Sequence, residues 1–221
     1  MCDETLGGQL MKKIMYSLFI LLLLTACSKE PAMDRQLKEL LVAVDEKDNQ
    51  GKTIVKKLTK LERKEQDLFN EAMELTQRKY PEVKQRVAAL KKSAHERTNL
   101  LEKEEHAADK AKEAVERLSE WAASAGSSEQ TQVEAVAAVL QKRYEEHETF
   151  VLEYKKMIDS QTQLYTQLED REVRDRELQK YAAEVNNLLI SCRQTLEEYN
   201  ELTLQANRLA GRAIVSLEKA K

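Results

Sequence analysis

Apolar residues recur at alternating intervals of three and four positions along most of this chain. The repeat runs through residues 83–125, 133–168 and 178–213, and a weaker copy runs through 37–75. Side chains three and four positions apart share one face of an α-helix, whereas a strand would require alternation at every second residue. A period of 3.5 residues over five or more heptads makes helices wrap around one another in a left-handed sense. The sequence therefore predicts an all-α protein whose long helices pack through coiled-coil-like seams.

Few residues are present that would interrupt such helices. The glycines and prolines from Pro31 onward are Pro31, Gly51, Pro81, Gly126 and Gly211. Charged residues make up 34% of the chain and aromatic residues 5%, a composition that is typical of long amphipathic helices and not of sheets. The net charge of −3 also argues against nucleic acid as a partner.

Three interruptions of the repeat divide the chain into four predicted helices. They fall near residues 79–81, 124–128 and 169–175. Pro81 suits the first turn of a helix, and Ser127 with Gln130 has the spacing of a capping box. The third interruption lacks glycine and proline, and only a loss of the apolar seam marks it.

These boundaries predict an elongated antiparallel bundle of about four long helices. Each helix has about 40–45 residues and is therefore roughly 60–65 Å long. Similar lengths and short connections favour antiparallel neighbours, so we expect one bundle domain over residues 34–221. The polar stretch 47–51 is either a break or a weak point within the first helix.

The N-terminal region has the three parts of a secretory signal peptide, which we place at residues 1–26. A charged start at residues 11–13 is followed by an apolar run over 14–26 and then by Cys27. Thirteen residues in a helix cover about 20 Å, whereas a membrane span needs roughly 20 residues. A signal anchor is therefore the weaker interpretation.

The residues before this signal do not suit it. Residues 1–10 contain two acidic residues and two glycines, so we expect translation to start at Met11 and the first ten residues to be an upstream extension. At the other end, residues 27–33 are expected to form the lipidated N-terminus and a short tether.

The end of the apolar run, Leu24-Thr25-Ala26-Cys27, resembles a bacterial lipobox. In that motif the cysteine receives a thioether-linked diacylglycerol and becomes the N-terminus after cleavage. An ordinary signal peptide that ends near a cysteine is the alternative. The short apolar run and the small residue before Cys27 favour the lipobox. We therefore expect lipid on Cys27 and a location on the outer face of the cytoplasmic membrane.

Catalytic and metal-binding patterns are not found. None of His95, His106 and His147 is preceded by glutamate at three positions, as a di-iron bundle requires, so no metal site or cofactor is predicted. Cys192 lies on an apolar seam, where a cysteine acts as a small packing residue and not as a nucleophile. No catalytic residue is therefore assigned, although the sequence leaves open whether the protein is an enzyme.

Several seam positions hold aromatic or polar residues. The tyrosines on the seams are Tyr144, Tyr154, Tyr165, Tyr181 and Tyr199. Packing in the core explains them better than stacking on carbohydrate does. Arg97, Glu104, His147 and Gln161 also fall on seams, where polar residues either set helix register and partner choice or mark a place where the bundle opens.

Scattered helix positions resemble those of the YkyA-type cell-wall-binding lipoproteins of Gram-positive bacteria. They are Leu58, Leu61-Glu62, Glu65, Leu68, Arg97, Leu101, Glu102-Lys103-Glu104, Arg143-Tyr144, Tyr154-Lys155, Ile158, Leu164-Tyr165, Leu168, Asn187, Tyr199-Asn200 and Thr203. The resemblance implies an association with the cell wall, and descriptions of the family mention a hydrolase domain.

Three functions remain open from the sequence. The first is a lipid-anchored helical protein with a structural or binding role at the interface of membrane and wall, where it contacts peptidoglycan or an envelope protein. The second is a peptidoglycan hydrolase or another wall-acting enzyme. The third is a helical adaptor that oligomerises through its seams. The sequence does not define the oligomeric state.

Lipidation gives the first testable prediction. Replacement of Cys27 by Ala should abolish lipid attachment, because the thioether needs the thiol. Two acyl chains hold a membrane stably, so the variant should remain as uncleaved precursor or become soluble. Metabolic labelling with a fatty acid measures this. Uptake of label by the Cys27→Ala protein would show that the lipobox assignment is wrong.

Overall fold

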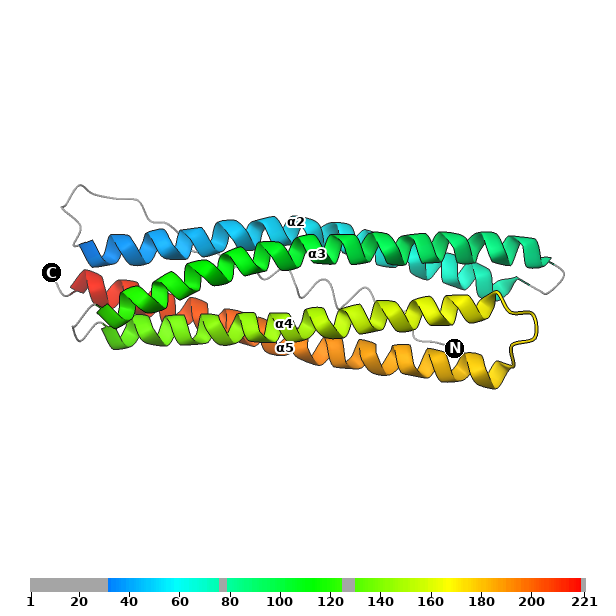
Figure 1. The fold of residues 1–221 in the computed structure, drawn as a ribbon. Coiled ribbons are helices and arrows are strands. Elements are labelled where there is room, and N and C mark those ends of the chain that lie inside the picture. Colours follow the sequence, from blue (N-terminus) through cyan, green and yellow to red (C-terminus); the bar gives the residue numbers. More distant parts are fainter. Residues whose placement is uncertain (1–31, 76–78, 125–129, 220–221) are drawn as a thin grey trace.

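Four long α-helices make up the described part of the chain. The structure, a computed structural model, describes residues 32–75, 79–124 and 130–219. The helices are α2 (Ala32–Glu74), α3 (Tyr80–Ser124), α4 (Gln130–Leu168) and α5 (Asp175–Lys219), with 43, 45, 39 and 45 residues. They lie side by side in one rod (Figure 1). The predicted all-α fold class, an elongated antiparallel bundle of four helices, is confirmed.

Each helix packs mainly on the helix that is next to it in the chain. The pairs α2 with α3, α3 with α4 and α4 with α5 are in extensive contact, whereas α2 and α5 touch little. An ion pair between Lys38 and Glu218, with a separation of 3.6 Å, joins the start of α2 to the end of α5. The bundle is therefore incompletely closed between its first and last helices.

The core of the described residues consists of two apolar clusters. The first contains Leu37, Leu118, Leu140 and Ala213 from the four helices, together with further small and aliphatic residues. The second is centred on α3 and α4 and includes Leu90, Leu101, Val151 and Ile158. Along α4 the two clusters are separated near His147, which is buried and polar.

Burial follows the predicted seams most closely in the two inner helices. On α3 the buried seam residues are Val87, Leu90, Ala94, Arg97, Leu101, Ala111, Val115, Leu118 and Ala122. On α2 and α5 several seam residues, such as Val55, Leu61, Val185 and Leu188, are only half-buried. The difference arises because α3 and α4 each have two extensive neighbours, whereas α2 and α5 each have one.

The helix boundaries agree with the predicted interruptions to within a few residues. α3 begins at Tyr80, so Pro81 lies in its first turn, as predicted. The turn after Leu168 is confirmed, and Asp170 Oδ1 accepts a hydrogen bond of 2.8 Å from the backbone N–H of Glu172 there. The predicted capping box at Ser127 lies outside the described residues.

The polar stretch 47–51 does not break the first helix. α2 runs without interruption through it, and Gly51 is buried. A Cβ atom at Gly51 would lie 3.4 Å from Oε1 of Glu104, so the glycine gives this carboxylate room between α2 and α3. Of the two possibilities left open by the sequence, the break is therefore wrong.

Seam packing gives the second prediction. Leu118 is fully buried in the first cluster, so Leu118→Ala should lower the free energy of unfolding by about 2–5 kcal/mol. Leu204 is 51% exposed on α5, so Leu204→Ala makes the same chemical change and should alter stability by less than about 0.5 kcal/mol. Urea denaturation of both variants measures the difference. Equal losses in the two variants would contradict the assignment of the seam.

Candidate functional site

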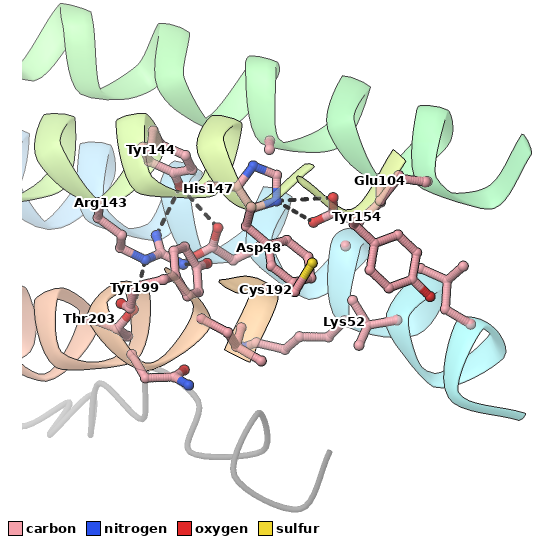
Figure 2. Close-up of a pocket in the computed structure, with 18 of the residues that line it drawn as sticks. Asp48, Lys52, Glu104, Arg143, Tyr144, His147, Tyr154, Cys192, Tyr199 and Thr203 are labelled. Carbon is pink, nitrogen blue, oxygen red and sulfur yellow. Dashed lines mark hydrogen bonds and ion pairs between the residues drawn. The ribbon is translucent and has the colours of Figure 1, made fainter. Parts of the chain in front are cut away.

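A cavity of about 130 Å³ lies between α2 and α5, where these helices fail to close the bundle. We call it the central cavity (Figure 2). Its apolar lining comes from all four helices and includes Val55, Leu58, Leu101, Met157, Leu189 and Leu196. α3 and α4 supply its floor, and α2 and α5 supply its two sides. The cavity is therefore an apolar space that is set between polar clusters.

Arg143 forms the first polar cluster, at one end of the cavity. Its side chain is buried, and its Nη2 atom lies 2.9 Å from Oδ2 of Asp48 on α2. Its Nε donates a 2.8 Å hydrogen bond to Oγ1 of Thr203 on α5. The guanidinium carbon also lies 4.5 Å from the centroid of the Tyr199 ring and 4.9 Å from that of Tyr144. One side chain of α4 thus joins α2 to α5 across the cavity (Figure 2).

The charge of this cluster is stable. Burial by itself lowers the pKa of Arg143, but Tyr199 and Asp48 more than compensate, and the net shift is upward. The pKa of Tyr144 is raised by burial and by Asp48, to whose Oδ1 its hydroxyl donates a 2.9 Å hydrogen bond. Arg143 therefore stays charged and Tyr144 stays neutral across the physiological pH range.

His147 and Glu104 form a second polar contact on the floor of the cavity. Nε2 of His147 lies 2.9 Å and 3.0 Å from the two carboxylate oxygens of Glu104. The His147 ring also packs at 5.8 Å from the Tyr199 ring, which brings α3, α4 and α5 together at this level. The sequence singles out both residues as polar side chains at seam positions, and the structure shows that they pair with each other.

Arg97 is the centre of a third polar cluster, which joins α2, α3 and α4. It is 1% exposed, and its Nη2 lies 2.8 Å from Oε1 of Glu65. Gln161 and Tyr154 also accept hydrogen bonds from its guanidinium group. The Tyr165 hydroxyl donates a 2.7 Å hydrogen bond to the same oxygen of Glu65. The polar seam residues Arg97 and Gln161 therefore fix the register of three helices.

Glu62 connects this cluster to the cavity, which it lines. Burial raises its pKa, and the hydrogen bond from Tyr154 and the charge of Arg97 only partly offset the rise. The folded protein thus binds a proton at Glu62 more readily than the unfolded chain does. Ionised Glu62 therefore lowers the free energy of unfolding at neutral pH. This loss shrinks as the pH falls through the pKa of Glu62 in the folded protein, and it is gone below the pKa in the unfolded chain.

Cys192 also lines the cavity but lacks the surroundings of a nucleophile. It is 2% exposed, and burial, reinforced by the charge of Glu153, raises its pKa to about 12. No hydrogen bond joins it to His147 within the described residues, although both line the same cavity. A reactive cysteine needs the opposite shift of its pKa. The arrangement favours binding over thiol chemistry.

The residues singled out in the sequence lie in different environments in the structure. Tyr144, Tyr154 and Tyr165 are buried, as predicted, and their hydroxyls contact carboxylates. Tyr181 and Tyr199, which were also expected in the core, are only half-buried. His95 and His106 are exposed on α3. The described residues contain no group of three or more metal-binding side chains. Cys27 and the rest of the lipobox lie outside the described residues.

Sequence reasoning gave no structural role to three residues of these clusters, namely Asp48, Glu65 and Arg143, although Glu65 and Arg143 are among the positions that carry the family resemblance. Asp48 lies in the polar stretch that suggested a weak helix, and Arg143 is next to the seam residue Tyr144. A usable signal was present, because buried cations at seam positions require carboxylates on a facing helix. α2 supplies both Asp48 and Glu65.

The fold and clusters define a helical-bundle protein with a partly polar interior, and comparisons with known proteins assign it to a family. The family model YkyA, described as "Putative cell-wall binding lipoprotein", matches residues 33–212, and the chain belongs to this family. It is a lipoprotein family. No stretch of the described helices combines the length and hydrophobicity that a membrane crossing requires.

The chain is also similar to two other proteins. The chain is 27% identical over 194 residues to the uncharacterized lipoprotein YkyA of Bacillus subtilis (strain 168), a match that covers 85% of this chain and 84% of that protein. A crystal structure of a conserved protein of unknown function from Staphylococcus aureus has a TM-score of 0.70 and 19% identity. It covers 86% of this chain and 97% of its own, and it shows the fold alone.

The buried ion pair between Arg97 and Glu65 gives the third prediction. Arg97→Met leaves the Glu65 carboxylate buried without its counter-charge and should cost about 3–5 kcal/mol of stability. The double variant Arg97→Met with Glu65→Leu removes both charges and should regain most of that loss. Urea denaturation of the native protein, both single variants and the double variant completes the cycle.

An exposed pair between the same two helices provides the control. Arg86 Nε lies 2.7 Å from Oε2 of Glu71, with the two side chains 40% and 53% exposed. Its coupling energy should be only about 0.2–1 kcal/mol. A coupling between Arg97 and Glu65 that is no larger than this would contradict a structural role for the buried pair.

Proposed function

We propose that the protein is a non-enzymatic lipoprotein, held at the outer face of the cytoplasmic membrane by diacylglycerol on Cys27, that binds a component of the cell wall. Membership of a lipoprotein family and the lipobox Leu24-Thr25-Ala26-Cys27 support the anchor. α2 begins at Ala32, five positions after Cys27. The bundle would therefore start directly at the membrane surface.

The central cavity carries the proposal of binding. Its sides are apolar, and aromatic side chains of Phe150, Tyr154 and Tyr199 contribute to its lining. Sugar rings present C–H groups on their faces and hydroxyls at their edges, and aromatic faces pack well against such surfaces. The polar end, with Arg143, Asp48 and Thr203, offers hydrogen-bonding groups in fixed positions. Peptidoglycan combines sugars with short peptides, and we propose it as the ligand.

A hydrolase is the weaker proposal. Cleavage would need a general acid or nucleophile with a suitable pKa in a cleft. In the cavity the Glu62 carboxyl has a raised pKa but accepts a hydrogen bond from Tyr154 and lies 3.9 Å from Arg97. The thiol of Cys192 has a raised pKa, and the Glu104 carboxylate is bound to His147. Arg143 is held by Asp48 and Thr203. These contacts suit a rigid binding surface better than a catalytic one.

An adaptor role is the second candidate, because exposed apolar side chains recur on one side of α5. Ile190, Leu204 and Val215 are 54%, 51% and 48% exposed, and their spacing of 14 and 11 residues places them on one face of the helix. Glu197, Glu201 and Arg208 separate these apolar side chains, so the surface fits a mixed polar and apolar contact with an envelope protein or a second copy. Contact with a second copy would appear as concentration-dependent association in analytical ultracentrifugation.

Sacculus binding gives the fourth prediction. Residues 28–221, which contain the whole described bundle, should sediment with purified sacculi. Leu189→Arg places a charge in the apolar lining of the cavity and should weaken binding by about tenfold or more, since tenfold corresponds to only about 1.4 kcal/mol. Ile190→Arg introduces the same charge at the next residue, outside the cavity, and should leave binding unchanged.

Circular dichroism should show that both arginine variants remain helical. If the two variants bind sacculi equally well, the cavity is not the binding site. Release of soluble muropeptides by the native protein would instead support the hydrolase.

A further inference from the structure

The middle of α2 carries a cluster of basic side chains on its outward face. Its members are Lys56, Lys57, Lys60, Arg63 and Lys64, all of which are exposed, and we call them the basic face. They span nine residues, or about 12 Å along the helix. On a chain with a net charge of −3, this is a strong local concentration of positive charge.

The fold creates this surface by separating the two signs of charge. Between Glu46 and Asp67 the only acidic residues of α2 are Asp48, Glu62 and Glu65. Asp48 pairs with the buried Arg143, and Glu65 with the buried Arg97. Glu62 lines the central cavity. Among the charged residues between Glu46 and Asp67, those that are exposed are therefore all cationic, while the side chain of Glu62 is 28% exposed.

The basic face also lacks counter-charges within the described residues. None of its five members lies within 4.0 Å of a carboxylate oxygen there, although other exposed cations do. Examples are Arg35 with Glu39, at 3.7 Å, and Arg174 with Glu177, at 2.8 Å. The exposed acidic residues of α2 that lie nearest to the cluster in sequence, Glu46 and Asp67, flank it without interrupting it.

We infer that the basic face docks on the anionic phospholipid headgroups of the membrane that holds the anchor, so that the bundle lies along the bilayer instead of projecting from it. This inference rests on the proposed function, because it needs the protein to be attached at that membrane. α2 is the first helix after Cys27, and the four residues between Cys27 and Ala32 reach no more than about 14 Å.

The position of the basic face along α2 fits this arrangement. Lys60 lies 28 residues after Ala32, or about 42 Å along the helix. An upright bundle would hold it far beyond the Debye length of about 8 Å at physiological salt, whereas a bundle lying flat brings it to the surface. Each basic residue near an anionic surface adds about 1 kcal/mol, and the anchor already keeps the face at high local concentration.

The central cavity remains accessible in this orientation. Val55, Leu58 and Glu62, which line the cavity, lie about 165° around α2 from the middle of the basic face, at 3.6 residues per turn. Contact with the membrane through the basic face therefore leaves the opening between α2 and α5 uncovered. The two surfaces can act at the same time.

The test is cosedimentation of residues 28–221, without lipid, with vesicles of phosphatidylcholine alone or mixed with phosphatidylglycerol. The native protein should bind the mixed vesicles preferentially, and added salt should weaken the binding. The triple variant Lys56→Glu, Lys60→Glu and Arg63→Glu should bind about a hundredfold more weakly, because each basic residue contributes roughly fivefold. Circular dichroism and a thermal melt check that it stays folded.

A matched control separates the basic face from net charge. Lys110→Glu, Arg117→Glu and Lys142→Glu change the net charge equally, at exposed positions spread over α3 and α4, and this variant should keep the native affinity. Equal losses in the two triple variants would overturn the inference. The inference also fails if the native protein shows no preference for phosphatidylglycerol.

Sacculus binding, measured on the same proteins, distinguishes the remaining outcomes. If the basic-face variant loses sacculus binding while the native protein ignores both kinds of vesicle, the surface binds an anionic wall polymer and the membrane proposal is wrong. If the native protein prefers anionic vesicles but does not bind sacculi, the inference that the basic face docks on the membrane is supported and the proposed wall-binding function fails.

Discussion

Two buried arginines determine how this bundle is assembled. Arg97 on α3 and Arg143 on α4 are 1% and 3% exposed, and a charge removed from water so completely must find a carboxylate. Both carboxylates come from α2, through Glu65 and Asp48. An apolar seam alone tolerates sliding by a heptad, whereas a slipped α2 would leave two arginines without their partners. The ion pairs therefore select one register among several that the apolar residues would accept.

The same reasoning explains which parts of the fold could be predicted from the sequence. Apolar periodicity is a local property, so it correctly predicted the four helices, and even the turn after Leu168, which has no glycine or proline. Partners across the bundle are not local. Nothing near Asp48 reveals that Arg143 faces it, and the polar stretch 47–51 suggested a weak helix when viewed alone. The central cavity also depends on helix spacing, which periodicity does not specify.

The inner helices have more packing neighbours than the outer ones, and this difference explains both the cavity and the charged surface of α2. α3 and α4 each have two neighbours and bury their seams, whereas α2 and α5 meet only in part and leave a cavity between them. α2 must therefore satisfy the buried arginines with its acidic residues while its outward side faces solvent. This division of charge leaves Lys56, Lys60 and Arg63 exposed, and none of them has a carboxylate oxygen within 4.0 Å among the described residues. The interior thus determines the electrostatic character of the exterior.

The two ion pairs of α2 also have a mechanical consequence. Asp48 and Glu65 are 17 residues apart, or about 25 Å along the helix axis. A force that pulls on the start of α2 along its axis loads both pairs in shear, so they must break together. A force across the axis would instead peel α2 away and break them one after the other. The bundle should therefore resist axial tension at its N-terminal end better than lateral tension.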